Sequence, residues 1–237
     1  MWGAGHASCW TDGSANSEWE ARDAMKDIVI VGAGGFGREV AWLVEEINTV
    51  SPEWRLLGFL DDMAKGSTVE GYPILGPIEH VAQLGQHVYL TCAIGDSRLR
   101  KCLVDKLAES GRRFATLVHP SVLKSAYVSI GEGSTICAGT ILTTNISIGN
   151  YCLLNLDCKV GHDSTLGDFT SCMPAVNIAG DVIIEKGCYF GLNACVINQK
   201  RVGEWSIVGA GAAVVKDIPA RSLAVGVPAM PIKTLDV

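Results

Sequence analysis

One histidine stands out in the second half of the chain, because the sequence from Pro120 to the C-terminus contains no other. This residue, His162, is followed directly by Asp163 in the segment KVGHDSTLGDF. An imidazole beside a carboxylate is typical of a general base, since the carboxylate fixes the ring tautomer and raises its basicity. The pair therefore predicts proton abstraction from a nucleophile, against the simpler alternative of a surface histidine without a role.

A second candidate site is the glycine-rich segment VGAGGFGREV, with the spacing Gly32-x-Gly34-x-x-Gly37 after a short apolar run. This spacing is typical of a strand-to-helix turn that approaches a diphosphate. Two acids, Asp61 and Asp62, follow at about the distance expected for a ribose contact. The same glycines suit any tight turn and the acids suit a solvated strand end, so both alternatives stay open.

The first half of the chain must form the elements that hold this turn. The apolar run Ile28–Val31 precedes it, and apolar residues then recur at helical spacing from Val40 to Ile47. Further strands are predicted in WRLLGFLDD and HVYLTCAIGD, a helix in SRLRKCLVDKLAESG, and a fourth strand at Phe114–Val118. Strands that alternate with helices predict a small parallel α/β domain, Rossmann-like, over residues 25–119.

Beyond this domain a six-residue period replaces the helical pattern. Every sixth residue from Ile130 to Val214 is apolar, cysteine included, over fifteen positions without an insertion. Glycine often follows that residue, and a small side chain often lies four positions after it, as at Ser134 and Cys152. An unbroken hexad is the signature of a parallel β-helix, which we predict over residues 120–237. Its coils stack at about 4.8 Å, and glycine is expected to permit the corner backbone angles.

In such a prism His162 occupies the third position of its hexad, at a corner that faces outward. One and two coils later, Gly180 and Asn198 are expected directly above it. A base beside a stacked glycine amide supplies a proton acceptor and an oxyanion donor at one exposed edge. Direct group transfer needs only these two groups and alignment of the reactants.

The cysteines and histidines argue against disulfides and metal. The nine cysteines are odd in number and contain no C-x-x-C, which favours a reduced, cytoplasmic protein. Cys152, Cys158 and Cys188 lie where the repeat requires a small buried side chain. A metal-dependent lyase on a prism of this kind needs three histidine ligands, and only His162 is available after Pro120, so no metal is expected.

Composition limits the partners. The formal net charge of -6 disfavours nucleic acid and anionic lipid, and no apolar run approaches the roughly 20 residues of a membrane helix. Residues 1–24 lack the apolar core of a secretion signal, so we predict a disordered extension with the fold beginning at Met25.

A prism with an apolar face and a groove open on one side predicts a homotrimer, in which a neighbour completes the site.

The hexads, together with GVPA at Gly226–Ala229, resemble the hexapeptide-repeat acyltransferases. The order VGAGGFGREV, FLDD, AIGD and then a prism is similar to the bacterial sugar acetyltransferases, over about residues 26–232. That subgroup includes UDP-4-amino-sugar N-acetyltransferases and sialic acid O-acetyltransferases. The resemblance implies a Rossmann-like domain followed by a left-handed β-helix, with acetyl-CoA as co-substrate in a groove between the prisms of a trimer.

The resemblance also implies roles for individual residues in transfer. His162 would be the general base, Asp163 its acidic partner, Asn155 part of the site lining, and the Gly180 amide the oxyanion donor. Acetyl-CoA would contact the positions of Leu192, Ala210 and Ser171. Ser171 replaces a histidine of some relatives, which puts that contact in doubt. Met230 replaces a basic residue after GVPA, which leaves Arg221 or Lys233 for the coenzyme phosphates.

For the acceptor, the resemblance implies a nucleotide-linked sugar on the first domain. Gly34, Gly35 and Phe36 would approach the diphosphate, Asp61 and Asp62 would contact ribose or uracil, and Gly95 would lie close by. We expect N-acetylation of a UDP-linked 4-amino-4,6-dideoxy sugar. The alternatives are O-acetylation of sialic acid or another surface sugar, and a non-catalytic protein that binds nucleotide sugars.

Overall fold

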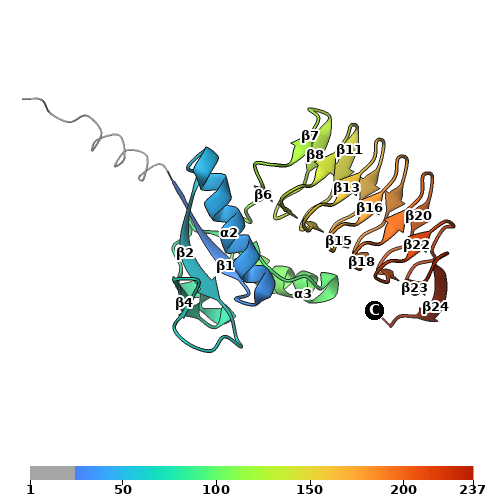
Figure 1. The fold of residues 1–237 in the computed structure, drawn as a ribbon. Helices are drawn as coiled ribbons and strands as arrows, with labels where there is room; N and C mark the ends of the chain where they lie inside the picture. The colour runs from blue at the N-terminus through green and yellow to red at the C-terminus, as the bar shows by residue number, and fades with distance from the viewer. Residues whose placement is uncertain (1–24, 237) are drawn as a thin grey trace, which may run out of the picture.

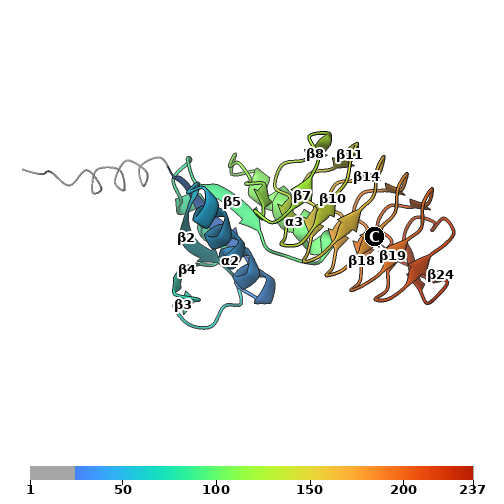
Figure 2. The ribbon, with the colours of Figure 1, turned by 45° about the horizontal axis from the view of Figure 1, so that its top comes forward.

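The computed structural model describes residues 25–236, so the predicted extension over residues 1–24 lies outside the described residues. An α/β domain comes first along the chain, and a prism of short stacked strands follows it (Figure 1). Helix α3 lies at the junction of the two in both views (Figures 1 and 2). The predicted fold class, a Rossmann-like domain followed by a left-handed β-helix, is confirmed.

The α/β domain contains one five-stranded sheet with the order β3-β4-β2-β1-β5. Its elements are β1 (Lys26–Val31), α2 (Gly35–Val50), β2 (Trp54–Leu60), β3 (Thr68–Val69), β4 (Tyr72–Gly76), η1 (Ile78–Gln83), β5 (Tyr89–Cys92) and α3 (Ser97–Ala108). The apolar face of α2, predicted from Val40 to Ile47, is buried against the sheet. Strands β1, β2 and β5 and both helices agree with the sequence prediction, whereas β3, β4 and η1 were not predicted.

The predicted fourth strand, Phe114–Val118, is divided between the two domains. Phe114 makes one isolated bridge to Leu90 of β5, and Leu117–Val118 forms β6, which pairs with β9 of the prism. The prism therefore begins at β6, slightly before the predicted boundary at residue 120. The physical reason is the hexad itself, because Val118 stands in phase with Ile130, two periods later, and continues the stacking of the coils.

Three sheets form the prism, parallel except for the antiparallel last pair of strands in one of them, and we call them the first, second and third face in the order that the chain meets them. The first face contains β6 (Leu117–Val118), β9 (Thr135–Ile136), β12 (Leu153–Leu154), β15 (Ser171–Cys172), β18 (Tyr189–Phe190), β21 (Ile207–Val208), β23 (Ser222–Val225) and β24 (Met230–Thr234). The second contains β7 (Leu123–Lys124), β10 (Ile141–Leu142), β13 (Lys159–Val160), β16 (Asn177–Ile178), β19 (Cys195–Val196) and β22 (Ala213–Val214). The third contains β8 (Val128–Ile130), β11 (Ile146–Ile148), β14 (Thr165–Leu166), β17 (Ile183–Ile184) and β20 (Arg201–Val202).

The hexad positions fill the interior of the prism as predicted. Each coil pairs with the next at an offset of 18 residues, as between Val160 and Ile178. From Ile136 to Val214 the apolar hexad residues are buried, and only Ile130, in an early coil, is half-buried.

The cysteine prediction is also confirmed for Cys152, Cys158 and Cys188, which are buried and free. Burial raises the pKa of the Cys152 thiol to about 12, which keeps it protonated and unreactive.

The backbone role predicted for the corner glycines holds at Gly133, Gly139, Gly187 and Gly211 but not at the glycines that directly follow the hexad residue. Left-handed backbone angles occur three positions after the hexad residue, mostly at non-glycine residues such as Asn145 (φ 55°) and Asp163 (φ 60°). The glycines that follow the hexad residue serve close approach instead. A Cβ on Gly161 would lie 2.6 Å from the backbone of Ala179 and Gly180 in the next coil, so only hydrogen fits there.

The two domains are held together by a buried arginine on α3. Arg100 is only 2% exposed, and its Nε donates to the carbonyl of Tyr151 at 2.9 Å. Its Nη1 donates to the carbonyl of Ile94 at 2.7 Å, and its Nη2 to the carbonyl of Phe169 at 2.9 Å and to Oγ of Ser171 at 2.8 Å. One guanidinium therefore fixes the loop after β5 to two successive coils of the prism, since its donors reach acceptors in both domains.

Candidate functional site

His162 lies at the corner between β13 and β14, on the edge that the second and third faces share. Its side chain is 62% exposed, so a substrate can reach the ring. Its Nδ1 lies 2.7 Å from Oδ2 of Asp163. Because Nδ1 is the nitrogen beside the carboxylate, Nε2 is left to accept a proton from a substrate.

Asp163 is itself held in place by the coil below it. Nδ2 of Asn145, one coil earlier, donates to Oδ1 of Asp163 at 2.6 Å. This hydrogen bond, and secondly the one with His162, hold the pKa of the Asp163 carboxyl below its usual range. The carboxylate is thus ionised at every pH at which the imidazole would act as a base, and both of its oxygens are in use.

Gly180 lies directly against the imidazole, as the 18-residue stacking predicted. A Cβ at this position would be 2.5 Å from Nε2 of His162, so any side chain would displace the ring. The N–H of Gly180 donates to no acceptor within residues 25–236. A base and an unused amide therefore adjoin each other, which is the pairing that acyl transfer requires.

The other residues predicted for the transfer site lie on a different edge. Asn155 precedes β13 and His162 follows it, so the two occupy opposite ends of this strand. Asn155 is 7% exposed, and its Oδ1 accepts from the N–H of Leu156 at 2.7 Å. Within one chain, Asn155 is therefore not brought to the imidazole.

Leu192 and Ala210 stack on the same edge as Asn155, where the first and second faces meet. Both are exposed, and they lie one coil apart. Gly191 allows this stacking, because a Cβ there would be 2.5 Å from the backbone nitrogen of Ala210. The edge offers small and apolar groups to an extended ligand, as expected for the arm of a coenzyme.

Ser171 lies in the contact between the two domains. It is fully buried, and its Oγ accepts from Oγ of Ser97 at 2.9 Å and from Arg100 while donating to the carbonyl of Gly95 at 2.8 Å. The hydroxyl belongs to the contact between the domains. The expected coenzyme contact of Ser171 is thus replaced by a structural role, because α3 covers this position.

The two basic residues considered for the coenzyme phosphates differ in their surroundings. Arg221 forms an ion pair with Glu204 at 3.4 Å. Lys233 on β24 is exposed and forms no ion pair with any described residue. Of the two residues, Lys233 therefore has the charged group that is more available to a phosphate.

The glycine-rich turn has the geometry that its spacing predicted. A Cβ on Gly37 would lie 2.1 Å from the carbonyl oxygen of Gly32, so this glycine lets α2 begin against β1. Gly34 is the N-cap of α2, and space around it is open. Gly35 and Phe36 form the first turn of the helix, and the free amides of such a turn are suited to hold a phosphate.

Of the two acids after β2, Asp61 supports this turn and Asp62 supports the start of η1. Oδ2 of Asp61 accepts from the N–H of Ala33 at 2.7 Å, and Oδ1 of Asp62 accepts from the N–H of Ile78 at 2.8 Å. The turn, Asp61 and Gly95 all follow the carboxyl ends of adjacent strands β1, β2 and β5. In open parallel sheets, ligands bind at this edge.

Sequence reasoning missed Asn145 and Arg100. Asn145 stands 18 residues before Asp163, so the period that identified Gly180 above the histidine also identifies Asn145 below it. Arg100 had no such signal, because its acceptors are backbone carbonyls on coils that only the tertiary structure brings near.

Neither a metal cluster nor a membrane helix is found in the described part of the chain. No group of three or more His, Cys, Asp or Glu side chains within residues 25–236 is arranged to hold a metal ion. No helix in the same range is long and apolar enough to cross a bilayer.

We compared the sequence with known protein families and with characterised proteins. Residues 27–107 match the PglD N-terminal domain family. The GDP-perosamine N-acetyltransferase of Escherichia coli is 30% identical over 183 residues, which cover 77% of this chain and 82% of that protein. The UDP-N-acetylbacillosamine N-acetyltransferase of Bacillus subtilis is 36% identical over 119 residues, which cover 48% of this chain and 52% of that protein.

Solved structures share the whole architecture. Perosamine N-acetyltransferase from Caulobacter crescentus, in complex with CoA and GDP-perosamine, has a TM-score of 0.80 and 32% identity, covering 87% of this chain and 97% of that chain. The acetyltransferase domain of PglB from Neisseria gonorrhoeae in complex with acetyl coenzyme A has a TM-score of 0.81 and 28% identity, covering 88% and 100%.

Proposed function

The chain belongs to the family of hexapeptide-repeat sugar acetyltransferases, and from this premise we propose that it transfers the acetyl group of acetyl-CoA to the amino group of a nucleotide-linked sugar. The observation that carries the proposal is the arrangement of His162, its Nδ1 held by Asp163 and its ring placed against the Gly180 amide. A base of this kind has no evident use in a protein that only binds nucleotide sugars.

In the proposed reaction the sugar nitrogen attacks the thioester carbonyl, so that a C–N bond forms and the C–S bond breaks. Nε2 of His162 takes the proton that the nitrogen loses and returns a proton to the departing thiolate. The N–H of Gly180 stabilises the negative charge on the carbonyl oxygen. No covalent acetyl-enzyme is needed, because the two substrates react directly once they are aligned.

The first domain and the relatives support a nucleotide-linked sugar as the acceptor. The turn from Gly34 to Phe36 and Asp61 form the edge at which a nucleotide diphosphate would bind. Both curated relatives are named as N-acetyltransferases of nucleotide-linked sugars, one GDP-linked and one UDP-linked. We favour a UDP-linked 4-amino-4,6-dideoxy sugar, with a GDP-linked amino sugar second and O-acetylation of sialic acid third.

A site shared between chains accounts for the separation of the residues. The α/β domain packs on the first face through Ser97 and Arg100, whereas His162 lies on the edge of the other two faces. The second face carries a hydrophobic groove of about 550 Å³, lined in part by Ile141, Ile178 and Ile197. We propose that this face packs against a neighbouring prism in a homotrimer, with acetyl-CoA between the two.

The proposed location is the cytoplasm. Eight cysteines within the described residues are free, although six of them are buried. Free thiols in this number fit a reducing compartment, in which disulfides are rare.

The test is CoA release from acetyl-CoA by the purified protein with four acceptors, which are a UDP-linked 4-amino-4,6-dideoxy sugar, GDP-perosamine, sialic acid and water. We expect release with an amino sugar, and a loss of kcat/KM of roughly 10²–10⁴-fold in His162→Ala. His87→Gln is the matched control, because His87 is also exposed but lies in the first domain, and it should keep full activity. The acetylated product is identified by mass spectrometry.

Two outcomes would contradict the proposal. Release with sialic acid alone would assign O-acetylation and leave the first domain without its proposed ligand. Equal rates for His162→Ala and the unchanged protein would remove the imidazole from the reaction, whichever acceptor is used.

A further inference from the structure

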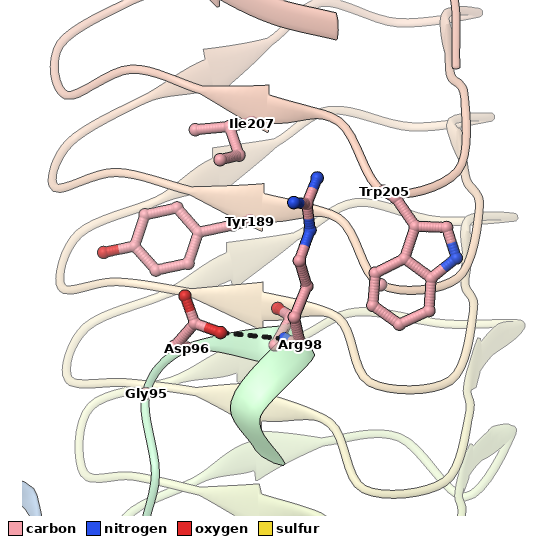
Figure 3. Close-up of a pocket in the computed structure, with 8 residues that line it drawn as sticks. Gly95, Asp96, Arg98, Tyr189, Trp205 and Ile207 are labelled. Carbon is pink, nitrogen blue, oxygen red and sulfur yellow. Dashed lines mark hydrogen bonds between the residues drawn. The ribbon is translucent and has the colours of Figure 1, made fainter. Parts of the chain in front are cut away.

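A cavity of about 320 Å³ lies between the beginning of α3 and the first face of the prism (Figure 3). Both domains contribute side chains to it, which are those of Asp96, Arg98, Tyr189, Trp205 and Ile207. Neither His162 nor the glycine-rich turn takes part, and the groove on the second face shares none of its lining residues. The proposed transfer reaction therefore leaves this cavity without a use.

The prism side of the cavity is aromatic because a stack of rings on one edge is interrupted. Tyr151 and Phe169 stack in successive coils, with ring centroids 5.1 Å apart. The next coil has Gly187 at the corresponding position, and the one after has Trp205. A Cβ on Gly187 would be 2.2 Å from the indole, so this glycine lets the Trp205 ring lie against the coil below it. The indole there forms one wall of the cavity.

The α3 side of the cavity carries two opposite charges that are not paired. Asp96 and Arg98 stand two positions apart, and neither forms an ion pair with any residue from 25 to 236. Oδ1 of Asp96 accepts from the N–H groups of Arg98 and Leu99, whereas Oδ2 accepts from no described residue. Nη1 of Arg98 donates to the uncharged carbonyl of Asp236 at 2.7 Å, and its buried Nη2 has no acceptor in the described chain. Unused buried donors are rare in native proteins.

The two charges and the aromatic wall together restrict the chemistry of a ligand. A guanidinium with a free N–H favours a carboxylate, and a free carboxylate oxygen favours an ammonium. An anion alone would be repelled by Asp96 and a cation alone by Arg98, so a molecule with both charges is favoured. Aromatic walls favour a ligand that also carries a ring, because rings pack well edge to face or offset.

We propose that this cavity binds a free α-amino acid with an aromatic side chain, such as phenylalanine. Its carboxylate accepts from Arg98, its ammonium donates to Oδ2 of Asp96, and its ring packs against Tyr189 and Trp205, which lie on either side of Arg98 in Figure 3. A volume near 320 Å³ is at the lower end of the range for small-molecule pockets, which suits an amino acid and is too small for coenzyme A or a whole nucleotide sugar.

Such a ligand would join the two domains without reacting. It contacts α3 on one side and the first face on the other, so it binds only when the domains are docked. Phenylalanine should therefore raise the melting temperature of the protein, as any ligand specific to the folded state does. The inference does not rest on the proposed function, because it requires neither acetyl-CoA nor a sugar.

The first experiment compares three ligands by ligand-observed NMR titration of the full chain. Phenylalanine carries both charges, 3-phenylpropionate lacks the ammonium, and phenethylamine lacks the carboxylate. We expect a Kd of about 0.1–1 mM for phenylalanine, in keeping with its small size. Each analogue should bind about tenfold more weakly, because it loses one charged hydrogen bond.

Two variants assign the charges to their partners. Asp96→Asn keeps a capping side chain on α3, and should weaken phenylalanine about tenfold while leaving 3-phenylpropionate no weaker. Arg98→Gln should weaken phenylalanine to a similar extent and leave phenethylamine no weaker. Asp105→Asn is the matched control, since it removes an equal charge from the same helix outside the cavity, and should change none of the three.

Three results would overturn the inference. One is no binding of phenylalanine to the unchanged protein at ten times the expected Kd. Another is equal affinity for all three ligands, which would mean that the charges are not recognised, and this comparison needs no variant. The third is displacement of phenylalanine by UDP or acetyl-CoA, which would place it in a substrate site. Failure of the proposed function is separate, because it appears as absence of transfer while the amino acid still binds.

Discussion

At the scale of the residue, the site depends on a chain of three side chains, Asn145, Asp163 and His162, in two successive coils. Each link has a distinct purpose. The amide of Asn145 holds one oxygen of the carboxylate, and the other oxygen holds Nδ1 of the imidazole. The left-handed backbone at Asn145 and Asp163 suits these two residue types, because Asn and Asp tolerate it better than most. The repeat thus supplies both the stacking and the backbone that the chain of contacts needs.

Replacing Asn145 should alter the ionisation of Asp163. In Asn145→Ala the pKa of the Asp163 carboxyl should rise toward its ordinary value, because the first cause of its depression is removed. The depressed pKa means that the ionised, hydrogen-bonded form is complete above the ordinary value near 3.8 and is lost only as the pH falls through the lower folded value. Carboxyl-carbon NMR titration measures the shift directly.

The same variant should retain most of its transfer activity at neutral pH, since Asp163 stays ionised there. Asp163→Asn is the contrasting variant and should lower kcat by roughly a hundredfold, because the imidazole loses its anionic partner at all pH values. An unchanged titration curve in Asn145→Ala would show that the amide does not act on the carboxylate.

At the scale of the element, close stacking of the coils explains two glycines with different consequences. Gly161 faces the backbone of the next coil, whereas Gly180 faces the end of the His162 side chain. The first contact cannot relax without separating the coils. The second relaxes by rotation of one ring. Gly161 is therefore expected to affect stability, and Gly180 is expected to affect the proposed catalytic step.

Alanine at each glycine should show this separation. Gly161→Ala should lower the free energy of unfolding by about 1–3 kcal/mol, as for other overpacked interiors. Gly180→Ala should leave that free energy nearly unchanged and lower kcat at least tenfold, because the Cβ pushes the imidazole from its position. Urea unfolding and steady-state rates on the same preparations provide the comparison, and a rate for Gly180→Ala equal to that of the unchanged protein would contradict the assigned role.

At the scale of the whole molecule, the glycine-rich turn proposed to bind the acceptor and the proposed base His162 lie on parts of the chain that do not face each other. The α/β domain covers the first face, and the outward residues of the second face are the apolar Leu123, Ile141 and Cys195 together with the polar Lys159 and Asn177. The third face instead presents Ser147 and Arg201 among its outward residues. The second face is thus the one that packing against a neighbour would bury.

Mixed trimers should reveal a shared site. His162→Ala lacks the base and Asp61→Ala lacks the support of the glycine-rich turn, so each alone should be nearly inactive. If acceptor and base come from different chains, co-expression of the two variants should restore a measurable fraction of the activity. Sedimentation should give the mass of three 25.1 kDa chains. Activity that stays absent in verified mixed trimers would place the whole site within one chain.

Most elements of both domains follow from the amino-acid sequence alone. The hexad period specifies which residues face the interior, because each coil repeats the same three strands, and the same period predicts the contact of Gly180 with His162. The glycine-rich turn was equally predictable, since the close contact of Gly37 with Gly32 is local to the turn. The hairpin of β3 and β4 was not, because short strands carry too little periodic signal.

The way in which the two domains meet is a property of the tertiary structure. The docking of α3 buries Ser171, which the family resemblance assigned to the coenzyme, and creates the cavity beside Gly187. The bonds of Ser97 and Arg100 to the prism join residues 51 to 91 positions apart, mostly through backbone carbonyls. A backbone carbonyl can accept a hydrogen bond at any residue, so the contacts of Ser97 and Arg100 could not be predicted from residue types in the sequence. The physical reason is that a period describes stacking along the prism but not what lies against its faces.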